Sequence, residues 1–334
     1  AFGTSALGSN TTGAQNTAVG QLALTANTTG ANNTAVGSNA LDANTTGHSN
    51  VAVGTNALGA NITHVANTMV GYQAGLSTVA DANTFVGYQC GQTNTTGTNN
   101  TALAVNALYS NTSGSNNTAL GREALFANTT GYQNTAVGKS AGAAITTGYN
   151  NTIMGYLAGD AITTGHTNTF LGEVAGGATT TGYTNAAIGS GALSSNSTGS
   201  DNVAVGISAL AANTTANNNT AVGRSALTAS TTGDLNTAVG KDSLNACTTG
   251  YRNTAMGVDS LNDLTTGGYN SGFGQHALNK ITTGTYNVAI GYNSGGVTTT
   301  GSNNITLGSD SATTAVDSDG QCTLGSSSIT NLRC

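Results

Sequence analysis

The chain has 334 residues, of which only 6% are charged, and its formal net charge is −6. Ordinary globular domains carry roughly 25% charged residues, so the surface of this protein must consist largely of Asn, Thr, Ser and Gly. The sequence contains no basic patch, which argues against a nucleic-acid partner, and no apolar run long enough for membrane insertion.

A repeat of 17 residues organises the chain. Its clearest part is Asn-Thr-Ala-Val-Gly, which occurs at 16–20 and 33–37 and returns as Asn-Val-Ala-Val-Gly at 50–54. A short fixed period is typical of solenoids. Helices are excluded because Gly recurs in every repeat and costs about 1 kcal/mol per helical position relative to Ala. We therefore expect an all-β protein, a parallel β-solenoid (β-roll) of about 19 coils, with two short strands and two turns in each coil.

The repeat is irregular in a few places. The Gly that closes the repeated segment, which we call the marker glycine, is replaced once by Ala104, and the step from Gly71 to Gly87 has only 16 residues. Near the C-terminus the Thr-Thr-Gly of each repeat is lost. We therefore divide the chain into a solenoid shaft, residues 1–308, and a transition segment, residues 309–334, that leads towards a further C-terminal region.

Residues at the same place in successive repeats form columns, which we name after the member in repeat 16–32. The Asn16 column is Asn in nearly every copy, and we expect its amides to stack, each donating to one neighbouring coil and accepting from the other. This ladder includes Asn16, Asn33, Asn50, Asn117 and Asn134. Many members of the Asn27 column begin N-x-S/T sequences. We interpret them as turn formers, with N-glycosylation as the alternative.

The three residues between Asn and the marker glycine are expected to form a strand. Thr17 and Val19 alternate onto one face. We expect the Val and Leu columns to form core ladders beside the marker glycines, with the members Val19, Val36, Leu24, Leu41, Gly20 and Gly37.

The opposite face of this strand is also apolar. Its members include Ala18, Ala35, Met69, Phe85, Ile153 and Phe170. Because a 17-residue coil is too thin to cover both faces, we expect the same strand of neighbouring chains to cover this one. The sequence therefore predicts a parallel homo-oligomer. These columns do not set the number of chains; we expect a homotrimer, intertwined or side by side, because three chains close such a bundle.

The second half of the coil shows an exchange of volume between two positions. Where Gly replaces Leu in the Leu24 column, an apolar or branched residue follows three positions later, as in Gly142 with Ile145, which suits a core of fixed volume.

The coil closes with the turn sequence Thr-Thr-Gly, in which we expect Gly30 to have a positive φ. We expect the Thr29 hydroxyl to bond the backbone, with an outward Thr ladder that orders water as the alternative.

Residues with chemical potential are scattered. The four His and four Cys lie in separate coils without metal-ligand spacing. The acidic residues are scattered, so the sequence assures no carboxylate pair, and the glycines form no nucleotide-binding loop. We therefore expect a non-enzymatic protein without a metal or cofactor. Tyr recurs in the turns, and Tyr132, Tyr149 and Tyr251 are candidate contacts to a glycan, although such rings can also simply cover the turns.

The repeated pattern N-T-A-V-G-x-x-A resembles the head repeats of trimeric autotransporter adhesins, which form a parallel β-roll as a trimer. Runs such as 33–41 and 117–125 are also similar to repetitive tail fibres of bacteriophages, notably of the cyanophage type. In those fibres a segment like 324–334 leads into a C-terminal chaperone of the endosialidase type. The resemblance implies a structural protein of the virion.

We therefore expect the shaft of a phage tail fibre, which projects or forms a surface for host recognition and adhesion. Its expected partners are two further copies of itself and a cell-surface glycan or protein receptor. One alternative is a trimeric bacterial adhesin or extracellular filament at the cell surface, which an upstream membrane anchor would favour. The other is an ice-binding solenoid, which thermal hysteresis would favour.

Overall fold

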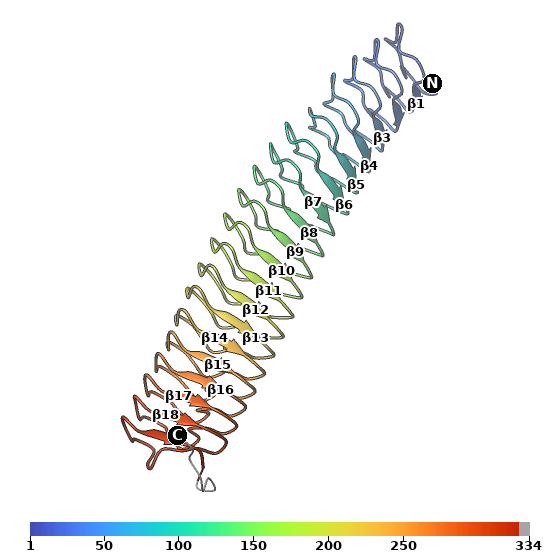
Figure 1. Ribbon diagram of the computed structural model, residues 1–334. Helices are drawn as coiled ribbons and strands as arrows, with labels where there is room; N and C mark the ends of the chain where they lie inside the picture. The colour runs from blue at the N-terminus through green and yellow to red at the C-terminus, as the bar shows by residue number, and fades with distance from the viewer. Residues whose placement is uncertain (327–334) are drawn as a thin grey trace. The chain divides into compact units, whose positions relative to one another are not determined.

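The structure, a computed structural model, describes residues 1–326, which fall into two compact units that divide after Asn168. Unit 1 is Ala1–Asn168 and unit 2 begins at Thr169. Each unit is a stack of coils that contribute one short strand each (Figure 1). The expected parallel β-solenoid with a 17-residue repeat is confirmed, but each coil has one strand rather than two, because its Ala-Leu half forms turns.

All described strands have three residues and occupy the expected positions. Unit 1 contains β1 (Thr17–Val19), β2 (Thr34–Val36), β3 (Val51–Val53), β4 (Thr68–Val70), β5 (Thr84–Val86), β6 (Thr101–Leu103), β7 (Thr118–Leu120), β8 (Thr135–Val137) and β9 (Thr152–Met154). Unit 2 contains β10 (Thr169–Leu171), β11 (Ala186–Ile188), β12 (Val203–Val205), β13 (Thr220–Val222), β14 (Thr237–Val239), β15 (Thr254–Met256), β16 (Ser271–Phe273), β17 (Val288–Ile290), β18 (Ile305–Leu307) and β19 (Cys322–Leu324).

Within each unit, every strand pairs in parallel with the next one along the chain, and equivalent residues face each other. Thr17 pairs with Thr34 and Val19 with Val36 in this way. In unit 2, β19 still pairs with β18 in the same register. The strand repeat therefore continues past the boundary expected at residue 308, while residues 327–334 of the predicted transition segment lie outside the described residues.

The middle residue of each strand points into the coil. Ala18, Ala35, Met69, Phe85, Ile153 and Phe170 are only 0–1% exposed within a single chain. The prediction that they form an interchain face is therefore wrong. The coil is so narrow that the Ala18 column and the Ala-Leu segment fill its interior, and Leu24 and Leu41 are fully buried there as expected. Val19, predicted as core, is 39% exposed on the outside instead, and Val36 is half-buried.

The Ala-Leu segment turns the chain through two left-handed residues. Leu24 has a φ of 52° and Leu22 a φ of 59°, a region that L-amino acids adopt at some cost. This conformation directs the Leu24 side chain into the interior, where it is fully buried. Ile145, which lies three residues after Gly142 in a coil where Gly replaces Leu, is also fully buried, as the expectation of a constant core volume requires.

The Asn16 column forms a ladder, as predicted, although most of its partners are backbone groups. Asn16 Oδ1 accepts a hydrogen bond from the Asn33 amide at 2.9 Å, and Asn16 Nδ2 donates to the Gly30 carbonyl at 2.7 Å. Asn33 repeats this arrangement with Asn50 N at 3.0 Å and the Gly47 carbonyl at 2.8 Å. Each amide thus ties the start of one strand to the next coil and to a turn.

An amide-to-amide stack runs through the Asn27 column as well as through part of the Asn16 column, where Asn151 Nδ2 donates to Asn134 Oδ1 at 3.0 Å. Asn44 Nδ2 donates to Asn27 Oδ1 at 2.8 Å, and Asn27 Nδ2 donates to Asn10 Oδ1 at 2.7 Å. Asn27 and Asn44 are fully buried, so the folded coil presents no acceptor for N-glycosylation at these positions. The stack is divided into runs of consecutive Asn residues. The last Asn of each run, Asn61, Asn128 or Asn213, has a side-chain Oδ1 without a hydrogen-bond partner, because the next residue in the column is Thr78, Ile145 or Ser230.

The turn glycine is required for space and not for a positive φ, contrary to our expectation for Gly30. A Cβ on Gly30 would overlap the Gly47 carbonyl oxygen and lie 2.9 Å from Asn44 Nδ2. His64, Ala80 and Ala216 occupy this column nevertheless. After His64 and Ala216 the next coil has a shorter residue, Thr78 or Ser230, in place of the opposing Asn, whereas after Ala80 it has Asn94.

Candidate functional site

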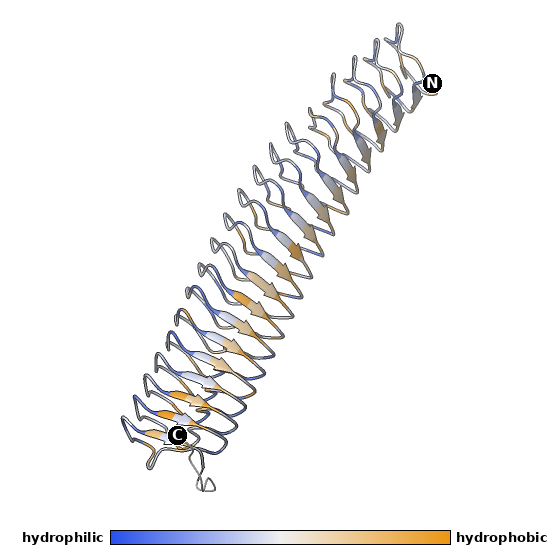
Figure 2. Cartoon of the chain, in the orientation of Figure 1, coloured by the Kyte–Doolittle hydropathy of each residue, from blue (hydrophilic) through white to orange (hydrophobic). Residues whose placement is uncertain are grey.

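The outward side of the strands forms an uncharged face on each unit, which we call the sheet face. It consists of the Thr17 column, mostly Thr and Val, and the Val19 column, which is Val, Leu, Ile, Met or Phe throughout. In unit 1, Leu103 is 51% and Met154 48% exposed; in unit 2, Ile290 is 47% exposed. Figure 2 shows hydrophobic colouring along the strands of both units. An apolar residue recurs on every strand, so the exposed surface is continuous within each unit.

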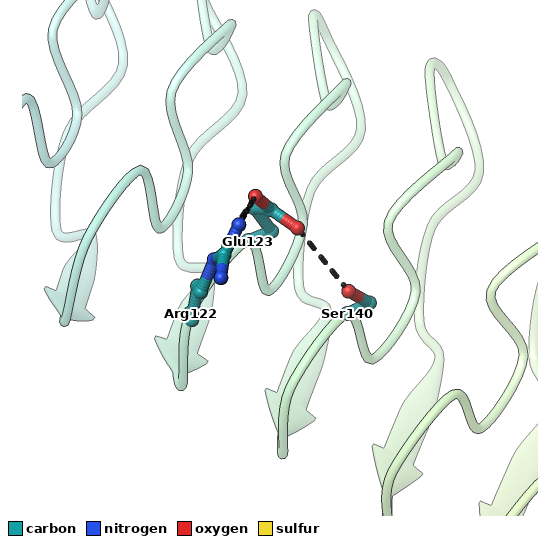
Figure 3. Close-up of polar contacts among 3 residues, drawn as sticks. All are labelled: Arg122, Glu123 and Ser140. Atoms are coloured by element: carbon teal, nitrogen blue, oxygen red, sulfur yellow. Dashed lines mark hydrogen bonds and ion pairs between the residues drawn. The ribbon is translucent and has the colours of Figure 1, made fainter.

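Charged residues lie beside the sheet face, after the marker glycine. Arg122 Nη2 is 3.0 Å from Glu123 Oε1, and Ser140 Oγ of the next coil donates to Glu123 Oε2 at 3.4 Å (Figure 3). Lys139 Nζ lies 5.4 Å from the centre of the Tyr156 ring. The Arg122 side chain is 61% exposed, and such surface pairs contribute about 0–1 kcal/mol. These charges therefore border the sheet face without interrupting it.

The candidate glycan contacts in unit 1 are engaged with one another. The rings of Tyr132 and Tyr149 stack with their centres 5.0 Å apart, and Tyr149 stacks on His166 at 4.6 Å. Stacking covers both faces of the Tyr149 ring and one face of the Tyr132 ring, which a sugar would otherwise contact. Tyr132 remains 43% exposed, so the two rings cover the turns while one side of Tyr132 stays open.

Tyr251, the third candidate, lies in a different arrangement in unit 2. A shallow pocket of about 400 Å³ opens there, and we call it the turn pocket; its lining residues are Thr232, Asp234, Leu235, Thr249, Tyr251, Arg252 and Tyr269. The Tyr251 and Tyr269 rings meet edge to face at an interplanar angle of 76°. Tyr251 thus contributes to a concave surface.

The sequence held two signals that were missed. The Tyr column shifts by one position between Tyr251 and Tyr269, and Gly268 fills the vacated place. This shift predicts that ring stacking stops there. The second signal is that the Ala18 column, which is Ala in most coils, points inward, whereas the Val19 column, which contains no residue smaller than Val, points outward.

The titratable residues are dispersed among the described coils. His276 Nδ1 lies 3.9 Å from Asp259 Oδ2, but no group of three or more His, Cys, Asp or Glu in residues 1–326 could hold a metal ion. Desolvation by burial raises the pKa of Asp42 and of Asp160, which lie in separate coils. It also raises the pKa of the Cys90 and Cys247 thiols to about 12. Within the same residues, no helix has the length and apolar character to cross a membrane.

No family model matches the chain, and no curated protein matches it significantly. The features of this chain that bear on its function are the sheet face, the turn pocket and the resemblance of its repeats.

Proposed function

We propose that this chain is a non-enzymatic structural segment, the shaft of a phage tail fibre, which assembles as a parallel homotrimer through its sheet face. The observation that carries the proposal is the uncharged apolar Val19 column, repeated on every strand of both units. Monomeric soluble proteins rarely expose contiguous apolar patches larger than a few hundred Å². An exposed apolar face of this kind is therefore expected to be covered by a binding partner.

A second copy of the same chain fits this face better than an unrelated protein. Successive strands in a sheet lie about 4.8 Å apart, so any partner must present apolar groups at the same spacing along many coils. A parallel copy in register meets that condition at every strand. The absence of charge in the Thr17 and Val19 columns also removes the like-charge repulsion that would oppose pairing of identical faces.

The resemblance of the repeats to tail fibres and to trimeric adhesin heads supports three copies and a role in projecting a recognition element outside the cell. The runs 33–41 and 117–125 carry this resemblance for the phage fibre. A bacterial adhesin or extracellular filament uses the same assembly. It differs in its anchoring, so location on a virion distinguishes the two.

One observation favours ice binding as a second candidate. Thr29 is exposed, because Thr28, not Thr29, donates its hydroxyl to the Thr45 carbonyl at 3.1 Å. The Thr29 column therefore presents a row of exposed hydroxyls on the turns, which make no hydrogen bond to the backbone within the described coils. A monomeric chain with thermal hysteresis would support this candidate and leave the fibre proposal without its assembly.

The assembly is tested by the native mass of the whole chain in light scattering. We expect three times 32.6 kDa for the wild type, and dissociation to monomers for a Leu103→Asp/Val137→Asp variant, because buried carboxylates are costly. A Thr96→Asp/Thr130→Asp variant, altered two coils apart on the exposed Thr29 column, is the matched control and should keep the wild-type mass.

Three other outcomes would contradict the proposal. A wild-type mass of twice 32.6 kDa would keep the sheet face as the interface but overturn the trimer. A monomeric wild type would overturn the assembly altogether. Dissociation of the Thr96→Asp/Thr130→Asp variant alone would place the interface on the turn side.

A further inference from the structure

We propose that the turn pocket of unit 2 binds one residue of a neutral saccharide. This site adds a binding activity to the shaft and does not depend on the phage origin or on the trimer. It rests on three observations: an interrupted ring stack, a balanced pair of charges, and free hydroxyls at the rim.

The pocket exists because the ring stack is interrupted. Tyr251 occupies the column in which Tyr132 and Tyr149 stack, but the next coil has Gly268 there and Tyr269 one position later. A Cβ on Gly268 would lie 3.2 Å from Cε1 and from Cζ of Tyr251, so the ring lies over the glycine. Tyr251 remains 45% exposed, and no described ring stacks parallel to it. An aromatic surface is thus left open beside a hollow.

The polar groups of the pocket are partly fixed and partly free. Asp234 Oδ1 accepts a hydrogen bond from the Asn217 amide at 2.6 Å, which holds the carboxylate and leaves Oδ2 available. Arg252 Nη1 donates to the Tyr269 hydroxyl at 3.1 Å, and the guanidinium lies 5.5 Å from the centre of that ring. Asp234 and Arg252 form no ion pair with each other in the described structure. Both can therefore bond a ligand.

The remaining lining residues complete a mixed surface. Thr232 and Thr249 are exposed at the rim, and their hydroxyls are not used in hydrogen bonds within the described coils. Leu235, which is 46% exposed, supplies an apolar side. The pocket thus combines an acceptor, an oriented donor, two hydroxyls and two apolar surfaces.

A neutral sugar has the matching chemistry. Its hydroxyls can donate to Asp234 and accept from Arg252, while its C–H face can lie against Tyr251 and Leu235. One carboxylate and one guanidinium give the pocket no net charge, so an uncharged polyol leaves neither group uncompensated. An acidic sugar could pair its carboxylate with Arg252, but the like charge of Asp234 in the same pocket would oppose it.

The test is saturation-transfer NMR on the full chain, with glucose, galactose, mannose, N-acetylglucosamine and N-acetylgalactosamine as separate probes. At least one should bind with a millimolar Kd. We expect Tyr251→Ala and Asp234→Asn each to weaken that binding about tenfold or more. The matched control is Tyr132→Ala, a Tyr in the same column of unit 1. It should bind as the wild type does, and circular dichroism should show all variants folded.

Each contrary result overturns a stated part of the inference. Absence of binding by all five sugars below about 100 mM would reject the site. Unchanged binding in the Tyr251→Ala and Asp234→Asn variants, or equal loss in Tyr132→Ala, would place binding elsewhere. Tighter binding of glucuronic acid or N-acetylneuraminic acid than of every neutral probe would overturn the neutral class.

Discussion

Replacing Phe85 by Ala and Gly91 by Leu together should restore most of the stability that each substitution removes alone. Phe85→Ala is expected to lower the free energy of unfolding by about 3–5 kcal/mol, because it leaves a cavity in place of a fully buried ring. Gly91→Leu should cost a similar amount, since a Cβ at Gly91 would already lie 2.8 Å from Phe85 Cγ and overlap two further ring carbons. In the double variant, the Leu side chain at position 91 fills the cavity that Phe85→Ala leaves, so neither a void nor an overlap remains.

The next coil shows why the double variant should fold. It has Ala102 and Leu108 at the equivalent positions, both buried, and Leu108 has a φ of 53° where Gly91 has 58°. A Leu can therefore occupy this left-handed position when the facing strand residue is Ala. The same exchange of volume occurs in unit 2, where a Cβ on Gly176 would overlap the Phe170 ring.

Urea unfolding of the four proteins, followed by far-ultraviolet circular dichroism, measures the coupling between the two positions. We expect an interaction energy of several kcal/mol that favours the double variant, as is found for residues that share a cavity. Additive losses in the double variant would contradict the account, because they would mean that Phe85 and Leu at position 91 do not compete for the same space.

Asn134→Ala should destabilise unit 1 by about 3 kcal/mol or more, through loss of hydrogen bonds rather than of volume. Asn134 Oδ1 accepts from the Asn151 amide at 3.1 Å and from Asn151 Nδ2 at 3.0 Å. Asn134 Nδ2 donates to the Gly148 carbonyl at 2.9 Å. Asn134 and Asn151 are fully buried, so water cannot replace these bonds, and each abandoned group costs about 1–3 kcal/mol.

The matched control for this prediction is Thr147→Ala. Thr147 lies on the exposed Thr29 column, and its replacement should change the free energy of unfolding by no more than about 0.5 kcal/mol. Asn134→Asp should be at least as harmful as Asn134→Ala, since a carboxylate cannot donate to the Gly148 carbonyl and would be buried with its charge. If Asn134→Ala unfolds in urea as the control does, the ladder is not what holds the strands in register.

The period alone determined much of this fold in advance. It located every described strand, set their parallel register and identified the Asn16 ladder, because stacked coils place equivalent residues directly over one another. The second strand expected in each coil does not form. It could not decide which side of the strand faces inward, since both the Ala18 and the Val19 columns are apolar. Larger apolar residues are usually the more buried ones. Here the narrow coil reverses that preference, because the Leu24 column already fills the interior.

The partners of the Asn side chains and the turn pocket were harder to predict. Whether an amide bonds the neighbouring amide or the neighbouring backbone depends on the local geometry of the turn, which the sequence pattern does not specify. The pocket depends on a shift of Tyr by one position, from Tyr251 to Tyr269. Its consequence becomes visible only when Gly268 is seen beneath the Tyr251 ring.

The central claim is that copies of the chain cover the sheet face. It is tested most directly by comparing the maleimide labelling rates of a Leu103→Cys variant and a Thr96→Cys variant. The background carries Cys322→Ser and Cys334→Ser. Cys90 and Cys247 can stay, because burial raises the pKa of both thiols to about 12 and keeps them protonated and unreactive at pH 8. Leu103 is 51% exposed in a single chain, and Thr96 is exposed as well.

Because both positions are exposed in a single chain, a much lower labelling rate at one of them indicates that another molecule covers that position. If copies of the chain cover the sheet face, the Leu103→Cys variant should react at least about tenfold more slowly than the Thr96→Cys variant under native conditions, and both should react fast in denaturant. Equal native rates would mean that the sheet face is bare, and would contradict the assembly on which the proposed fibre depends.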